Sequence, residues 1–263
     1  MIKKFFTQRK LNIIFSLLAI IFMWLIWIVA YYITGNKLIV PAFSDTAQSF
    51  FRYLGDGTFW LALLNTFLRT LLAFIISFIL AAACALFAKL SKCTKAFLKP
   101  IIVFIRTLPT LAVMLIILKL TSGNRSFSPV IVTILVLFPM IFSQMLAAAD
   151  GIDTGLTEMA KVYKVSKKDR LFKIYLPIIA PNILSQTGAN ISLGLKIMIS
   201  AEVLANTVKS LGGMMQYSNI SAEVANLAAL TLVSVLIGLI IEFAISLIPR
   251  FACKWTGKEG TND

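Results

Sequence analysis

The chain has 263 residues, of which 59% are hydrophobic and 14% are charged, and its mean hydropathy is +0.90. Soluble domains are about 45–50% apolar and about 25% charged, so this composition excludes an ordinary soluble domain and indicates an integral membrane protein. The formal net charge is +14, and there is no histidine. Lysine and arginine gather at the ends of apolar runs rather than on a solvated face, which argues against a nucleic-acid partner.

Six apolar stretches are long enough to cross a bilayer, since a span needs about 20 residues. They cover residues 11–33, 69–88, 100–120, 128–148, 182–204 and 224–248. The first follows four basic residues, as in a signal peptide, but its apolar run is too long and no small-residue cleavage site follows. We therefore expect an all-α membrane protein with six transmembrane helices in a single domain over residues 1–263, with an uncleaved anchor helix over 11–33.

The basic residues predict the orientation of these spans. The N-terminus, the 89–99 loop, the 149–176 loop and the tail from residue 250 hold four, four, six and three of them, or 17 together. The opposite loops hold only Lys37, Arg52, Arg125 and Lys209. Because basic residues concentrate on the cytoplasmic side, both termini and the 149–176 loop are predicted to be cytoplasmic.

The stretch 41–68 then belongs to the outer face. Turn and helix-start residues lie in it, and its apolar residues recur near helical spacing. This pattern predicts interfacial helices that lead into the second span, with Arg69 at the outer membrane edge.

The loop over residues 150–177 has more structure than a linker. Asp153 can cap a first short helix that runs to about Lys164. Ser166 and Asp169 have a spacing similar to a capping box, which predicts a second short helix that Pro177 and Pro181 separate from the fifth span. The residues alone fit equally well a cationic loop that lies on anionic lipid.

The same loop resembles the EAA loop of permease subunits in binding-protein-dependent ABC importers. The family pattern is E-A-A, a glycine four residues after the second alanine, and a downstream I-x-L-P. Five positions match with the spacing intact, namely Glu158, Ala160, Ile174, Leu176 and Pro177. Met159 and Lys164 depart from the pattern, and a non-glycine in a left-handed bend at Lys164 would cost about 1 kcal/mol.

Further short motifs in the same order resemble the sulfonate/nitrate/taurine branch of this family, over about 58–250. They are Pro41–Asp45, Gly57-Thr58, Leu68-Arg69, Arg106–Pro109 and Ala201-Glu202. The resemblance implies a type I importer fold in a bacterial cytoplasmic membrane, a second permease copy or sister subunit, and an extracytoplasmic binding protein. It also implies that ATP and magnesium are held by a separate ATPase dimer, with no cofactor on this chain. The residues that would couple to the ATPase are Glu158, Ala160, Lys164, Val165, Ser166, Leu176 and Pro177.

Other functions find little support in the residues. No G-x-x-x-x-G-K-[ST] motif is present, so the chain holds no P-loop, and histidine, the usual general base, is absent. Cys84, Cys93 and Cys253 have neither metal-ligand nor disulfide spacing. A secondary transporter is the main rival, but it would use buried acids and often internal repeats. A membrane scaffold without transport also remains open.

Three charged residues are candidates for the substrate path. Lys196 lies 14 residues after Asn182, about 21 Å into the fifth span. Its partner could be a carbonyl, water, an anionic substrate, or Glu202 of a symmetry-related subunit, because Glu202 of the same helix is about 120° away. A snorkelling or packing lysine is the structural alternative. Arg106 is the third candidate, and packing beside a proline break is its alternative role.

The substrate itself is only partly constrained. The branch resemblance points to small anions such as sulfonates, nitrate or taurine-like compounds, and Lys196 favours an anion. A nitrogenous or vitamin-like solute moved by the same mechanism remains an alternative. Gly188, Ala189, Ser192 and Gly194 predict close helix contact along the fifth span.

Overall fold

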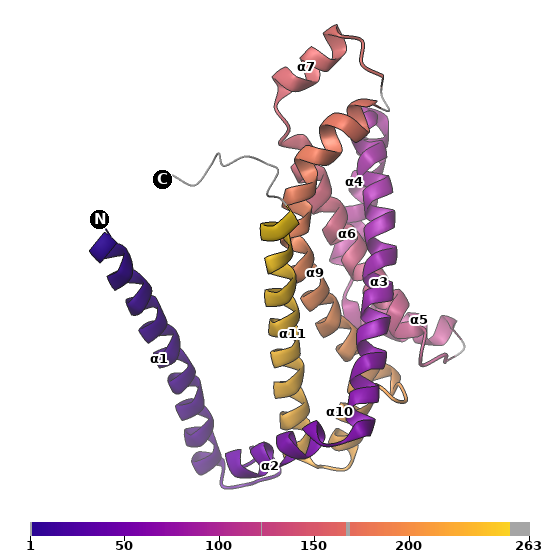
Figure 1. Ribbon diagram of the computed structural model, residues 1–263. Coiled ribbons are helices and arrows are strands. Elements are labelled where there is room, and N and C mark those ends of the chain that lie inside the picture. The colour runs from indigo at the N-terminus through magenta and orange to yellow at the C-terminus, as the bar shows by residue number, and fades with distance from the viewer. Residues whose placement is uncertain (1, 122, 167–168, 253–263) are drawn as a thin grey trace.

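The fold is a bundle of long helices with shorter helices at both ends (Figure 1). The computed structural model describes residues 2–121, 123–166 and 169–252, and within these ranges the regular elements are all helical. Cys253 and the basic tail that includes Lys254 and Lys258 lie outside the described residues. The prediction of an all-α chain is thus confirmed.

Four helices of the described chain are long and apolar enough to cross a membrane. They are α3 (Gly57–Leu90), α6 (Ser128–Asp150), α9 (Leu176–Ala205) and α11 (Val224–Ala252). α3 packs on α6, α6 on α9, and α9 on α11. The buried apolar side chains between them, with Phe142 and Leu195 among them, form the core that holds the bundle together.

The predicted third span is not one helix. It is split into α4 (Lys92–Thr107) and α5 (Thr110–Leu120), whose axes differ by 95°. Pro109 causes the break, because the residue before a proline is pushed out of helical backbone and Leu108 accordingly has a ψ of 130°. The proline break expected beside Arg106 is thus present, and it divides the apolar stretch predicted over 100–120 into two helices.

The first helix, α1 (Ile2–Thr34), is separated from the bundle over most of its length (Figure 1). Its attachment is at its C-terminal end, where Trp27 Nε1 donates to the Pro41 carbonyl at 3.1 Å and Trp24 meets Phe43 edge to face. Its described apolar part, Ile21–Thr34, is shorter than a span. The described helices give four spans, or five if α4 and α5 count as one, so a sixth span stays a prediction.

Two short helices, α2 (Phe43–Leu54) and α10 (Leu211–Ile220), close one end of the bundle (Figure 1). α2 is the predicted interfacial helix, but the rest of that stretch is already α3. Asp56 starts α3 by accepting the Thr58 N–H at 2.9 Å. The hydrogen bonds from the Thr58 hydroxyl and from this N–H lower the pKa of the Asp56 carboxyl. Arg69 is therefore in the fourth turn of a long helix rather than at its beginning.

The small residues of α9 are used for packing within the chain. A Cβ on Gly188 would come within 3.0 Å of the Glu242 carbonyl on α11, and one on Gly194 within 3.0 Å of Leu137 on α6. Ser192 is buried with them, whereas Ala189 is exposed. The predicted close helix contact is present, and it joins α9 to α11 and α6 of the same chain.

Candidate functional site

The loop predicted to couple with an ATPase contains α7 (Thr154–Val162), which projects beyond the end of the bundle (Figure 1). Asp153 caps it, because Asp153 Oδ1 accepts the Gly155 N–H at 3.0 Å. The predicted start of this helix is confirmed. The turn between α3 and α4, which begins the basic 89–99 segment, lies at the same end of the bundle (Figure 1).

α7 ends in a tight left-handed bend at Lys164. Lys164 has a φ of +51°, and the Val165 N–H donates to the Ala160 carbonyl across the bend at 3.0 Å. This six-residue closure is the Schellman arrangement, in which glycine is usual at the left-handed position. Lys164 thus adopts the strained conformation that the family's glycine would adopt without strain.

The exposed surface of α7 differs from the one expected from the motif. Ala160 is only 1% exposed, so its methyl group is covered by the chain itself and is not available to fill a groove on a partner. The outward surface is formed by Met159, Val162 and Tyr163, with Glu158 also exposed, and Val162 is 77% exposed. A projecting helix with an uncovered apolar face is typical of a docking element.

The second half of the loop runs directly into the fifth span. The Ser166 hydroxyl accepts the Asp169 N–H at 3.0 Å and donates to its carboxylate at 2.7 Å, which confirms the predicted capping pair. A π-helical turn, η1 (Arg170–Tyr175), then continues into α9 without a break. The expected separation at Pro177 and Pro181 was wrong.

The position of Pro177 explains this continuity. Proline is tolerated in the first turn of an α-helix, where its missing N–H is not needed, and Pro177 lies in the first turn of α9. The preceding π turn has already left i→i−4 bonding. Leu176 and Pro177, two of the predicted coupling residues, are exposed at this junction, and Val165 is half-buried.

Near the opposite end of α9, a buried carboxylate joins three helices. The Glu202 side chain is 0% exposed and accepts from Thr66 Oγ1 at 2.8 Å, Arg69 Nη1 at 3.0 Å and the Gly212 N–H at 3.3 Å. Thr66 Oγ1 also accepts the Leu211 N–H at 3.0 Å. Glu202, predicted for the substrate path, is thus bonded inside the fold in this conformation.

Sequence reasoning missed the partner of Glu202. It considered Lys196 and placed Arg69 at the membrane edge. The available signal was that Arg69 and Glu202 are opposite charges in two apolar helices. Because buried charges are usually paired, it could have predicted their contact.

Lys196 lies nine residues before the end of α9, about 14 Å from that end. It is exposed and forms no ion pair with any residue that the structure describes. With Thr110 and Ser200 it lines a cavity of about 270 Å³, between α9 and the start of α5. The Ser200 hydroxyl already donates to the Lys196 carbonyl at 2.9 Å, so the Lys196 ammonium and the Thr110 hydroxyl are the groups that can hold a small anion here.

Arg106 is in the last turn of α4, just before the break at Pro109, and is exposed. The cavity beside Lys196 is lined from Thr110 onward and does not include Arg106. The three predicted path residues are therefore not brought together within one subunit.

A polar stripe on α9 was also missed. Asn182, Gln186, Lys196 and Ser200 follow one another at intervals of four, ten and four residues, which keeps them on one side of a helix. Asn182 and Gln186 line a second cavity of about 470 Å³, together with Gln144 of α6. Gln186 donates to Asn182 Oδ1 at 2.6 Å and Ser200 to the Lys196 carbonyl at 2.9 Å, so part of this stripe is satisfied within the helix, while its remaining polar atoms suit water, a solute or another subunit.

Within the described ranges, no three histidine, cysteine, aspartate or glutamate side chains come together in a group that could hold a metal ion.

Comparison with known proteins identifies the class. The family model described as "Binding-protein-dependent transport system inner membrane component" matches residues 73–252, so the chain belongs to this family of ABC importer permeases. It is 25% identical over 189 residues to the aliphatic sulfonates transport permease protein SsuC of Bacillus subtilis (strain 168), covering 71% of this chain and 67% of that protein. It is 24% identical over 205 residues to the taurine transport system permease protein TauC of Escherichia coli (strain K12), covering 77% and 73%.

A solved structure shows the same fold. A bacterial ABC transporter involved in the import of the acidic polysaccharide alginate superposes with a TM-score of 0.66 at 16% identity, over 91% of this chain and 96% of that chain. The family match, together with the apolar helices, makes the chain a multi-pass membrane permease subunit.

Proposed function

We propose that the chain forms, with a second copy or a sister permease, the path by which an ATP-driven importer moves a small anionic solute such as a sulfonate or a taurine-like compound. The names of the two relatives support this substrate class. Lys196, which has no ion-pair partner in the described ranges and lines a cavity in the span, supports an anion independently.

ATP and magnesium are held by separate ATPase subunits in this proposal. The observation that carries the coupling is α7, which projects from the bundle with Met159, Val162 and Tyr163 uncovered. When the ATPase subunits close, they push this surface. Helical structure runs from Arg170 to Ala205 without a break, so movement of the loop is transmitted along it toward Lys196. The permease pair then switches between two discrete arrangements.

The distribution of basic residues supports the orientation. The α7 end and both termini face the cytoplasm of a bacterium, because the basic segments gather there. A binding protein delivers the solute at the other end, near α2 and α10. The polar stripe with Asn182 and Gln186 continues the path below Lys196 toward the cytoplasm.

The test uses the complete transporter, with ATPase subunits and binding protein, in proteoliposomes. Val162→Glu places a charge on the docking face, while Val162→Leu, which keeps that face apolar, is the matched control. We expect Val162→Glu to reduce both uptake of labelled taurine or ethanesulfonate and substrate-stimulated ATP hydrolysis. Unchanged coupling in Val162→Glu would contradict the docking role. A wild-type transporter that takes up neither taurine nor ethanesulfonate would contradict the proposed substrate class.

A further inference from the structure

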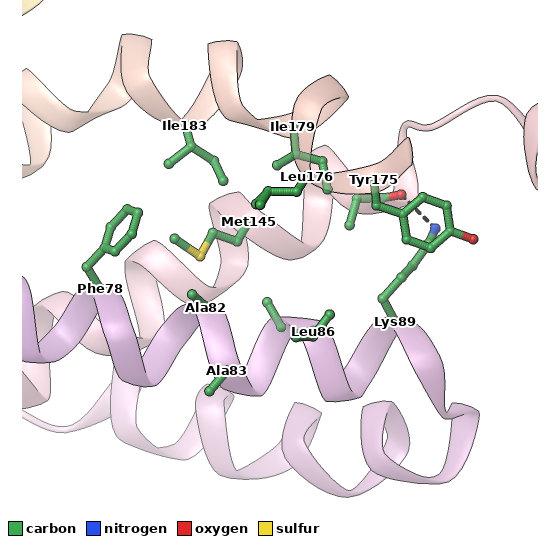
Figure 2. Close-up of a pocket in the computed structure, with 12 residues that line it drawn as sticks. Phe78, Ala82, Ala83, Leu86, Lys89, Met145, Tyr175, Leu176, Ile179 and Ile183 are labelled. Atoms are coloured by element: carbon green, nitrogen blue, oxygen red, sulfur yellow. Dashed lines mark hydrogen bonds between the residues drawn. The ribbon is translucent and has the colours of Figure 1, made fainter. Parts of the chain in front are cut away.

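An apolar slot opens beside the start of α9, on a different side of the helix from Lys196. It has a volume of about 230 Å³ and lies between α3, α6 and α9, with Phe78, Leu86 and Ile183 among its lining residues (Figure 2). Ile183 precedes Lys196 by 13 residues, which is about 220° around the helix. The slot is therefore separate from the cavity that Lys196 lines.

The slot has an apolar end and a cationic end. Lys89 and Tyr175 lie at one end, and Phe78 and Ile183 at the other (Figure 2). Eleven residues of α3 separate Phe78 from Lys89, which is about 16 Å along the helix. One leaflet of a bilayer has a hydrocarbon depth of about 15 Å. The slot thus runs from the headgroup level at the α7 end to about the middle of the membrane.

Positive charge is in excess at the mouth. Lys89 Nζ lies 5.7 Å and Arg170 Cζ 5.9 Å from the centre of the Tyr175 ring, so both cations meet at one side chain. Lys89 donates to the Ala149 carbonyl at 2.6 Å (Figure 2). Asp150 is the nearby acid, but Lys95 already contacts it at 2.6 Å and Lys89 lies 3.8 Å away.

Arg170 does not line the slot itself, but it lies beside the lining residue Tyr175 and has an unused donor. Its Nε atom is buried, and the Nε–H has no acceptor in the part of the chain that the structure describes. A buried donor without an acceptor is unfavourable, and a guanidinium is suited to bind phosphate oxygens in pairs. An acceptor from outside the chain would remove this deficit.

From these observations we infer that the slot binds one anionic phospholipid of the cytoplasmic leaflet. An acyl chain lies along Phe78, Leu86 and Ile183, and the phosphate accepts from Arg170 and Lys89. The length of the slot matches the depth of one leaflet, and its mouth carries more positive than negative charge. The Arg170 Nε–H, which lacks an acceptor in the described part of the chain, is suited to a phosphate oxygen. Because η1 joins the ATPase-facing loop to α9, a lipid here would stabilise the π turn through which the loop moves the span.

The wild-type transporter, purified with its ATPase subunits, tests the inference without any substitution. Native mass spectrometry would follow the titration of dioleoyl phosphatidylglycerol against dioleoyl phosphatidylcholine. We expect one phosphatidylglycerol retained per permease chain, with about tenfold or greater preference over phosphatidylcholine. Equal retention of both lipids, or retention of neither, would overturn the inference.

Two variants then place the lipid. Arg170→Gln removes the charge, and Ala83→Leu fills the slot at an exposed lining residue. Each should reduce phosphatidylglycerol retention about tenfold. Lys99→Gln and Ala244→Leu, at exposed positions of α4 and α11, are the matched controls and should retain it. Equal loss in the controls, or undiminished retention in Arg170→Gln or Ala83→Leu, would show that the lipid binds elsewhere.

Discussion

Arg69 and Glu202 are 133 residues apart in the chain, yet Arg69 Nη1 lies 3.0 Å from Glu202 Oε1 in the interior of the bundle. The pair joins α3 to α9 at the end opposite the 150–177 loop. Glu202 also accepts the Gly212 N–H, so the first turn of α10 is held by the same carboxylate. Any movement of α9 relative to α3 must carry this network with it or break it.

Removing one member of the pair should be more damaging than removing both. Arg69→Met leaves the Glu202 carboxylate buried with too few donors, and breaking a buried pair in this way costs about 3–5 kcal/mol. Replacing both residues by methionine removes the buried charge and should recover much of that loss. Thermal unfolding of the purified transporter measures the difference. A double variant as unstable as Arg69→Met would show that the pair is not the stabilising contact.

Gly212 gives an independent test of the same network. A Cβ there would come within 2.4 Å of Glu202 Cβ and 2.6 Å of the Ile199 carbonyl, so Gly212→Ala must displace α10 from α9. We expect a clear fall in melting temperature. Gly57→Ala is the control, because a Cβ at Gly57 meets nothing within 4 Å. Similar melting temperatures for the two variants would argue against close contact at Gly212.

Much of the fold could be predicted because its signals are local. Apolar runs predict membrane helices, and caps such as Asp153 and Ser166 act within three residues of themselves in the chain. The failures came from two sources. One is proline, whose effect depends on position: Pro109 breaks a span, whereas Pro177 fits into the first turn of α9.

The other source of error is long-range pairing. The contact between Arg69 and Glu202 depends on how α3 packs against α9, which no local pattern specifies. Ala160 shows a similar limit, because a sequence motif identifies the residue but not the direction of its methyl group. Because Ala160 is only 1% exposed, the outward surface of α7 is formed by Val162 and its neighbours instead.

Lys164 carries strain that glycine would relieve. Its φ of +51° is in the left-handed region, where a non-glycine residue costs about 1 kcal/mol. Lys164→Gly should stabilise the bend by a similar amount, and Lys164→Val should destabilise it. Hydrogen exchange of the Val165 amide, which donates to the Ala160 carbonyl, reports the bend directly. Faster exchange in Lys164→Gly than in Lys164→Val would contradict this account.

Cysteine labelling tests the orientation. Cys84, Cys93 and Cys253 are first replaced by serine, and single cysteines are introduced at Ser166 and Ile220. Because these positions lie at opposite ends of the bundle, only Ile220→Cys should react with an impermeant maleimide added to intact cells. Labelling of Ser166→Cys from outside would reverse the orientation.

Lys196 decides whether the path recognises an anion. Lys196→Met removes the charge at the cavity shared with Thr110 and Ser200, and loss of a charge-assisted contact corresponds to about 1.5–3 kcal/mol, or a 10- to 150-fold loss of transport. Melting temperature should not fall, because Lys196 forms no ion pair in the described part of the chain. Lys119→Met, at an exposed residue in the last turn of α5, controls for loss of a charge and should transport normally. Full uptake by Lys196→Met, with equal or higher stability, would make Lys196 a packing residue and remove the interior support for an anionic solute.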